Sequence, residues 1–213
     1  MFNKINALGI PIYRFHYDKD KIKYVNDELL KLEYHSNPNN MMWSGIKEDG
    51  SGINLHSLPQ FKDLFNWFHE CLDEVQKDMR LTCDRLKITS SWCNLNKPGQ
   101  FFHTHQHPNC FMSSNYYASG RKEDKTIWYM DNPYFKNSNL QPLSSNDVDQ
   151  GRLQIHHAEE TEPGKYIIFP PSIDHYATKN TSPEARITIA ANIYPTGNIS
   201  CGGVSNLKIE VKD

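Results

Sequence analysis

The sequence predicts a mainly β protein, in which an antiparallel sandwich, jelly roll or barrel follows two helices. Helical patterns occupy part of the first 84 residues, whereas from Arg85 onward the chain consists of short β segments separated by Gly, Pro, Asn or Asp. No helical pattern lies between those segments, which argues against a fold of alternating strands and helices. With 213 residues, 38% of them hydrophobic, the chain is long enough for one domain with a sizeable core and too short for two.

Two helices are expected before the β segments. Residues 18–35 carry aliphatic side chains at helical spacing and contain no Pro or Gly. From Phe61 a clearer apolar stripe begins, typical of a helix that packs against a sheet; its members are Leu64, Phe65, Phe68, Leu72 and Val75. The turn-rich residues 36–52 between the helices predict an exposed loop that carries Trp43.

Seven β segments are expected after the helices. They are residues 86–95, 110–119, 125–131, 151–157, 164–170, 185–194 and 206–211. Residues 132–151 are long and polar enough to predict a mobile loop. We therefore expect one domain, residues 1–213, in which residues 1–84 form a helical support region and residues 85–213 form the β core.

Charge and cysteine content argue against several classes of protein. The net charge of -2 and the pI near 6.5 lack the basic surplus that phosphate backbones select, so no nucleic-acid partner is expected. The chain shows neither a signal-peptide pattern nor an apolar run long enough to span a membrane, and we expect a cytoplasmic protein without a membrane partner. Five scattered cysteines without a CxxC pair indicate reduced thiols. An oligomer is compatible with the sequence.

Three histidines at alternate positions, His103, His105 and His107, stand in the stretch FFHTHQHP. On an extended strand they would share one face, because alternate side chains point the same way. Neighbouring members would lie ~6.6 Å apart and the outer pair ~13 Å apart, so at most two of the three can bind one metal ion. A third ligand must come from elsewhere in the chain.

His175 is the best placed candidate for that third ligand, since it follows one β segment and precedes another that opens with Arg186. The other candidates are His16, His35, His56, His69, His156 and His157, of which His156 and His157 are expected to be solvated strand residues. A metal held by three protein ligands leaves half of an octahedron free, as oxygen-activating non-haem iron requires. A guanidinium buried beside such a site would need an anionic partner, and a dicarboxylate cosubstrate would provide one for Arg186.

The order of these elements resembles that of the 2-oxoglutarate- and Fe(II)-dependent oxygenases with a double-stranded β-helix (jelly-roll) core. Within this prolyl-hydroxylase-like superfamily the likeness is to oxygenases of phages and marine bacteria, which would place a phage protein in the host cytoplasm. The matching elements, in order, are Trp92, Gly99, His105-Gln106-His107-Pro108, Ser113 to Tyr117, Phe169-Pro170, His175 and Arg186. The resemblance covers roughly half of the chain and implies a jelly-roll core with the N-terminal helices packed outside.

The resemblance also implies roles for individual residues. His105, His107 and His175 would bind Fe(II), and Arg186, Thr188, Tyr117 and Asn115 would bind 2-oxoglutarate. His103 and Trp92 would lie at the entrance or in the surroundings of the site. The implied activity is that of a dioxygenase that hydroxylates a C–H bond of a substrate and releases succinate and CO2.

One residue departs from the family pattern. The general motif is H-x-D, whereas the second position here is His107. A centre of three neutral histidines leaves the whole charge on the metal ion, which should strengthen binding of a dianionic cosubstrate and supply less electron density to iron.

Two other function classes remain open on the sequence alone. One is a cupin-type iron dioxygenase that uses three histidines without 2-oxoglutarate, and the other is a jelly-roll binding module that has lost its chemistry. A zinc hydrolase is disfavoured, because no Asp or Glu near the histidines offers itself as a general base. A protein side chain and a small metabolite are both compatible as substrate, since the loop around Trp43 and residues 132–151 carry no recognisable signature.

Overall fold

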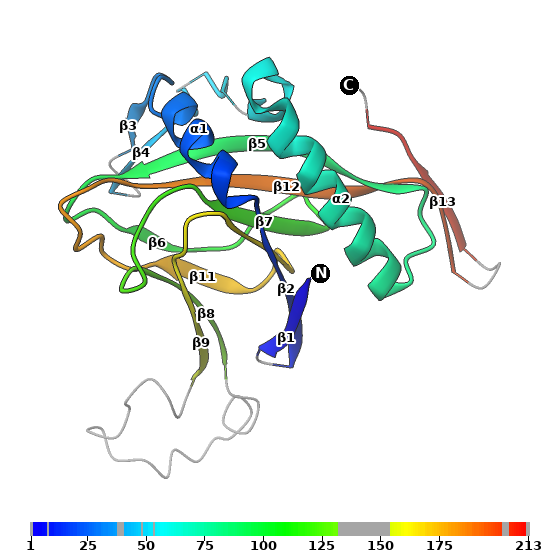
Figure 1. The fold of residues 1–213 in the computed structure, drawn as a ribbon. Coiled ribbons are helices and arrows are strands. Elements are labelled where there is room, and N and C mark those ends of the chain that lie inside the picture. Colours follow the sequence, from blue (N-terminus) through cyan, green and yellow to red (C-terminus); the bar gives the residue numbers. More distant parts are fainter. Residues whose placement is uncertain are drawn as a thin grey trace, which may run out of the picture.

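A computed structural model gives the fold of the chain, which is mainly β with two antiparallel sheets, as predicted (Figure 1). It describes residues 2–7, 9–37, 41–47, 49–52, 54–131, 154–201 and 205–211. The predicted mobile loop, residues 132–151, lies outside the described residues.

The larger sheet follows the order β1-β2-β10-β7-β12-β5-β4-β3, and β13 pairs with β12 off this path. Its strands are β1 (Asn3–Ala7), β2 (Ile10–His16), β3 (His35–Asn37), β4 (Met42–Ser44), β5 (Arg85–Asn96), β7 (Met112–Tyr117), β10 (Lys165–Phe169), β12 (Arg186–Cys201) and β13 (Ser205–Ile209). All pairs between these strands are antiparallel, so neighbouring strands run in opposite directions.

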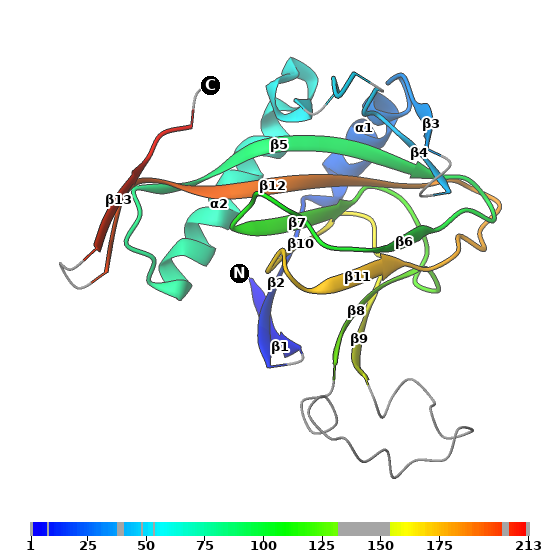
Figure 2. The same ribbon diagram turned by 180° about the vertical axis from the view of Figure 1, so that it is seen from behind.

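The smaller sheet follows the order β6-β11-β8-β9 and lies below the larger one in both views (Figure 2). Its strands are β6 (Phe102–His105), β8 (Lys125–Asp131), β9 (Gln154–Glu160) and β11 (Asp174–Ala177). An apolar cluster lies between the sheets and consists of Ile12, Tyr117, Trp128, Ile167, Phe169 and Ile173. The two facing sheets form the jelly-roll core that the sequence predicts.

Both long helices cover the outer face of the larger sheet (Figure 1). The first, α1 (Lys19–Leu29), is shorter than residues 18–35; it begins after Asp18, whose side chain accepts a hydrogen bond from the backbone N–H of Asp20 at 3.1 Å. The second, α2 (Lys62–Met79), buries the predicted apolar stripe, and its Phe68 stacks on Tyr166 of β10 with 4.0 Å between ring centroids. The helices are therefore packed outside the core, as predicted.

The N-terminal region contributes strands as well as helices, whereas the sequence predicts a helical support region in residues 1–84 and none of these strands. Strand β2 pairs with β10 and alternates its side chains, so that Tyr13 and Phe15 face the helices whereas Ile12 faces the smaller sheet. Such a short alternation carries little local signal, and its pairing partner lies some 150 residues later in the chain.

The prediction of an exposed loop around Trp43 is also wrong. Residues Met42–Ser44 form β4, which pairs with β5, and Met42 and Ser44 are buried. Trp43 is partly buried against the helix-side core, and the ammonium group of Lys97 lies 3.8 Å from its ring centroid. The turn residues of this segment connect short strands.

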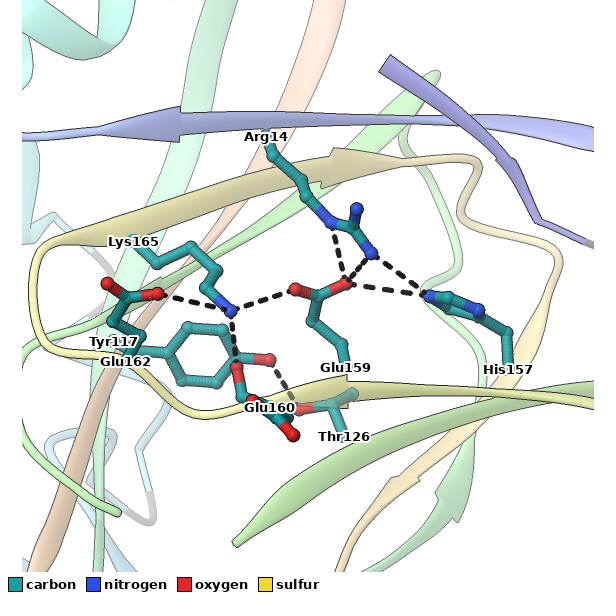
Figure 3. Close-up of polar contacts among 8 residues, drawn as sticks. All are labelled: Arg14, Tyr117, Thr126, His157, Glu159, Glu160, Glu162 and Lys165. Carbon is teal, nitrogen blue, oxygen red and sulfur yellow. Dashed lines mark hydrogen bonds and ion pairs between the residues drawn. The ribbon is translucent and has the colours of Figure 1, made fainter. Parts of the chain in front are cut away.

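A buried charge cluster joins β2 to the smaller sheet (Figure 3). The carboxylate of Glu159 on β9 accepts hydrogen bonds from Arg14 of β2, at 2.8 and 2.6 Å, and from Lys165 of β10 at 2.9 Å. His157 was expected to be solvated, but it is half-buried, and its Nε2 lies 3.3 Å from Arg14 and 3.5 Å from Glu159. Through these contacts, β2 and β10 of the larger sheet are joined to β9 of the smaller sheet.

Two further observations concern the whole chain. Cys71, Cys83, Cys93 and Cys110 are free thiols, as predicted. Within the described part of the chain, neither helix is both long and apolar enough to cross a membrane.

Candidate metal centre and anion pocket

Three histidine side chains converge between the two sheets. His105 ends β6, His175 lies directly opposite it on β11, and His107 follows two residues after β6 ends, where its backbone N–H donates to the carbonyl of Pro171 at 3.0 Å. One ring nitrogen from each of the three lies within 4.8 Å of the others. The break in the strand after His105 is what allows neighbouring alternate histidines to reach one point.

Backbone carbonyls orient two of these rings. Nδ1 of His105 lies 2.9 Å from the carbonyl of His103, and Nδ1 of His175 lies 3.0 Å from the carbonyl of Ile173. Because a carbonyl can only accept, both Nδ1 atoms carry the proton and both Nε2 atoms present a lone pair. The Nε2 atoms of His107 and His175 are 3.1 Å apart. The ring orientations are those that metal-binding histidines adopt.

Burial keeps the three imidazoles neutral. It lowers the pKa of His107 to about 4 and the pKa of His175 to about 3, and the neighbouring His105 acts in the same direction. Burial also lowers the pKa of His105, although its hydrogen bond to His103 opposes the shift. At neutral pH the cluster therefore offers unprotonated nitrogen ligands.

The other predicted histidine candidates lie elsewhere. His103 is exposed, and its ring contacts Phe101, while its carbonyl holds His105. His156 is exposed on β9, as expected, and stacks on Tyr129. Among the described residues, His105, His107 and His175 form the only cluster of three or more side chains that could hold a metal ion.

Arg186 lines the same pocket as the three histidines and is 2% exposed. Its Nη2 donates to the carbonyl of Thr178 at 2.8 Å and to Oδ1 of Asn96 at 3.4 Å, whereas its buried Nη1 has no hydrogen-bond partner among the described residues. Burial lowers the pKa of Arg186, opposed by the charges of Asp124 and Tyr117, but a guanidinium remains protonated in proteins. A buried cation with a free donor is a receptor for an anion.

The sequence of this region matches a known family. Residues 90–192 match the protein-family model described as "Putative 2OG-Fe(II) oxygenase". Over these residues the chain is similar to that family. The matched residues include the three histidines and Arg186, and the family is named for its iron and its cosubstrate, 2-oxoglutarate.

Solved structures of 2OG-Fe(II) oxygenases have a similar fold. A prolyl-4-hydroxylase from Pseudomonas putida has a TM-score of 0.60 at 10% identity, with 90% of this chain and 96% of that chain covered. HygX from Streptomyces hygroscopicus, crystallised with nickel, 2-oxoglutarate and hygromycin B, has a TM-score of 0.58 at 12% identity, with 87% and 83% covered. A 2OG-Fe(II) oxygenase family member from Burkholderia pseudomallei has a TM-score of 0.56 at 11% identity, with 84% and 79% covered. Among curated protein sequences, none matches this chain.

The remaining predicted residues of the oxygenase core also line the pocket. Thr188 follows Arg186 on the same face of β12, and Asn115 and Tyr117 lie on the neighbouring strand β7. The Tyr117 hydroxyl is 2.6 Å from Oγ1 of Thr126, and burial raises its pKa, so the phenol stays protonated. Trp92 lines the pocket with its ring centroid 6.1 Å from that of His107.

Sequence reasoning missed some features of the pocket and its surroundings, among them Asn96. Asn96 follows Trp92 by four positions on β5 and so shares its face, a signal that strand alternation could have supplied. Strand β11 was not predicted, because it has only four residues between turns. The hydrogen bond that Nε2 of Gln106 donates to Oδ1 of Asp174 at 3.0 Å was not predicted either. It joins the two segments that carry the histidines.

Proposed function

We propose that the chain is an Fe(II)- and 2-oxoglutarate-dependent dioxygenase that hydroxylates a C–H bond of a protein side chain or small metabolite, with release of succinate and CO2. The observation that carries the proposal is the placement, in one pocket, of three neutral converging histidines and a buried arginine with a free donor. A cupin-type dioxygenase without a dicarboxylate cosubstrate would have no use for that arginine. The family of the core points the same way.

The residues present fit a divalent transition metal. Imidazole nitrogen is a ligand that iron(II) accepts, and three such ligands leave coordination positions free for other molecules. His105, His107 and His175 would hold the ion, and the carbonyls of His103 and Ile173 would keep two of the rings in the binding tautomer. The tie between Gln106 and Asp174 would keep the two ligand-bearing segments in register.

The residues present also fit 2-oxoglutarate. Its distal carboxylate would pair with Arg186, which lacks an anionic partner at hydrogen-bond distance among the described residues, and the hydroxyl of Thr188 would donate a second hydrogen bond. Tyr117 and Asn115 would contact the cosubstrate from β7. When bound, iron would activate dioxygen, and oxidative decarboxylation of 2-oxoglutarate would supply two of the four electrons of its reduction, while the substrate C–H bond supplies the other two.

The protein itself would orient and shield these groups. The apolar side chains of Trp92, Phe102 and Phe169 line the pocket beside the histidines and would keep water away from reactive species. We further propose that residues 1–213 act as one oxygenase domain, in which the first 84 residues support the core through both helices and strands. The similar structures, a prolyl-4-hydroxylase and a protein bound to hygromycin B, are compatible with either substrate class.

An anaerobic titration of the purified protein with iron(II) and then 2-oxoglutarate tests the proposal. The wild-type protein should develop the weak visible charge-transfer band of the iron–2-oxoglutarate chelate, and the band should weaken in Arg186→Ala and in His107→Ala. Iron binding without the band would favour a three-histidine dioxygenase of the cupin type. Absence of iron binding would favour a binding module without this chemistry.

A further inference from the structure

Two buried hydrogen-bond donors without partners belong to two contacting side chains that line the pocket. One is Nη1 of Arg186, and the other is Nδ2 of Asn96, whose side chain is 3% exposed. A buried amide N–H without an acceptor costs free energy, so such a pair calls for an acceptor that is present in the working state. Neither donor finds one among the described residues.

The pairing of β5 with β12 sets the position of Asn96. The two strands lie side by side in the larger sheet (Figure 2), with Asn96 opposite Arg186, Asn94 opposite Thr188 and Trp92 opposite Ala190. Trp92 lies near His107, and Asn96 and Arg186 lie four residues further along the two strands, away from Trp92 and Ala190. The pocket therefore has a metal end and a cationic end.

One contact orients the side-chain amide of Asn96 and another holds its backbone. Its Oδ1 accepts from Nη2 of Arg186 at 3.4 Å, so the oxygen faces the cation and Nδ2 points elsewhere. Its backbone carbonyl accepts from Nδ2 of Asn180 at 2.8 Å, which holds the end of β5 in place. A flipped amide would place its N–H groups against the guanidinium, where they would find no acceptor.

We propose that Asn96 donates, through Nδ2, a further side-chain hydrogen bond to the distal carboxylate of 2-oxoglutarate, beside those from Arg186 and Thr188, and that the two buried donors of Asn96 and Arg186 select a dicarboxylic 2-oxo acid. The inference rests on the proposed function. A carboxylate has two oxygens and several lone pairs, and can accept from both donors at once. A 2-oxo acid with an uncharged tail leaves both donors unsatisfied, which penalises its binding.

The test compares two 2-oxo acids that share the chelating end. Anaerobic calorimetric titrations of the Fe(II)-loaded protein would measure the affinity for 2-oxoglutarate and for 2-oxobutanoate, which lacks the distal carboxylate. The variants are Asn96→Leu, which removes the donor, and Asn96→Asp, which places a carboxylate beside Arg186. Asn198→Ala, an exposed position on β12, serves as a control.

Asn96→Leu should weaken the binding of 2-oxoglutarate about 10- to 100-fold, the loss expected for one hydrogen bond to a charged group. The same variant should bind 2-oxobutanoate with unchanged affinity. Asn96→Asp should weaken the binding of 2-oxoglutarate further, because the new carboxylate would pair with the guanidinium of Arg186 and repel the carboxylate of the ligand. Asn198→Ala should bind both acids as the wild type does.

Three outcomes would overturn the inference. An unchanged affinity of Asn96→Leu for 2-oxoglutarate would show that Nδ2 makes no such bond. Equal weakening of both acids would make Asn96 a structural residue. Failure of the wild-type protein to bind 2-oxoglutarate would overturn the proposed function together with this inference, whereas the first two outcomes leave the proposed function standing.

Discussion

At the residue scale, the site depends on side chains that burial deprives of water. Burial keeps His107 and His175 neutral. Arg186 is buried as well, but it remains charged and has no carboxylate at hydrogen-bond distance among the described residues. A neutral imidazole is a ligand for a cation, and a buried guanidinium is a receptor for an anion. The pocket therefore combines both kinds of receptor within one cavity, although neither is evident from the composition of the chain.

Substitution of one ligand should remove metal binding without unfolding the protein. In His105→Ala we expect iron(II) affinity to fall by at least an order of magnitude and iron-dependent turnover to be lost, because two imidazoles hold the ion less well than three. Equilibrium dialysis with iron(II), together with circular dichroism, measures both effects. The matched control is His103→Ala, an exposed neighbour on the same strand, which should bind iron as the wild type does; equal loss in the two variants would contradict the assignment.

His107→Asp tests the effect of the neutral third ligand by restoring the H-x-D pattern. A carboxylate would offset part of the charge of the ion, so we expect iron(II) still to bind while the dianionic 2-oxoglutarate binds more weakly. Titrations of the iron-loaded variant and wild type with 2-oxoglutarate at one ionic strength would show the difference. Tighter binding of 2-oxoglutarate by His107→Asp would refute the electrostatic argument.

At the scale of elements, the charge cluster around Glu159 connects strands from distant parts of the chain. Burial opposes ionisation of Glu159, but hydrogen bonds and charges from Arg14 and Lys165 outweigh it and hold the pKa of this carboxyl below its ordinary value. Breaking a buried pair on one side leaves the remaining cation without its partner. The cluster is therefore a device that holds β2, β9 and β10 together (Figure 3).

Glu159→Gln should destabilise the protein by about 3 kcal/mol at pH 7. A carboxyl with a lowered folded-state pKa stabilises the fold above its ordinary pKa, and this contribution is lost as the pH falls through the folded-state value. The difference between wild type and variant should thus shrink in acid, below pH ~4.5. Urea unfolding at pH 7, 5 and 3.5 measures it, with the exposed Glu160→Gln as control. A difference that does not change with pH would mean that ionisation of Glu159 plays no part.

At the scale of the whole molecule, the N-terminal residues belong to the core that they precede. Strand β2 extends the larger sheet beyond β10, and its side chains fill both apolar clusters, Ile12 between the sheets and Tyr13 and Phe15 beneath the helices. The family match covers residues 90–192 alone. The matched core should therefore not fold well without the segments around it.

Deletion of residues 1–17 should abolish cooperative folding, because it removes β2, exposes the edge of β10 and opens both apolar clusters. Soluble yield and thermal unfolding of the truncated protein test this. Deletion of residues 1–8, which removes β1 from the edge of the sheet, is the matched control and should cost far less stability. A stable protein lacking residues 1–17 would show that the core is autonomous.

The sequence by itself determined the mainly β class, the two helices, the approximate positions of β5, β7, β8, β9, β10, β12 and β13, and the three histidines that converge. Those features follow from local periodicity, or from a motif whose order and spacing are visible along the chain. Helical spacing placed Leu64 to Val75 on one face, and that face is buried. The alternation of side chains along a strand predicted that Thr188 and Arg186 share one face, and both line the pocket.

Only the tertiary structure decided which groups meet. His107 and His175 are 68 positions apart, and Arg186 and Asn96 are 90 apart, so their contacts depend on which strands pair and in which register. The short strands β2, β4 and β11 carry too few residues for a periodic signal, and their partners lie far away in the chain. Burial is a property of the assembled layers, and it makes the histidines neutral. Within the described residues, the assembled layers also leave Arg186 without a carboxylate at hydrogen-bond distance and Nδ2 of Asn96 without an acceptor.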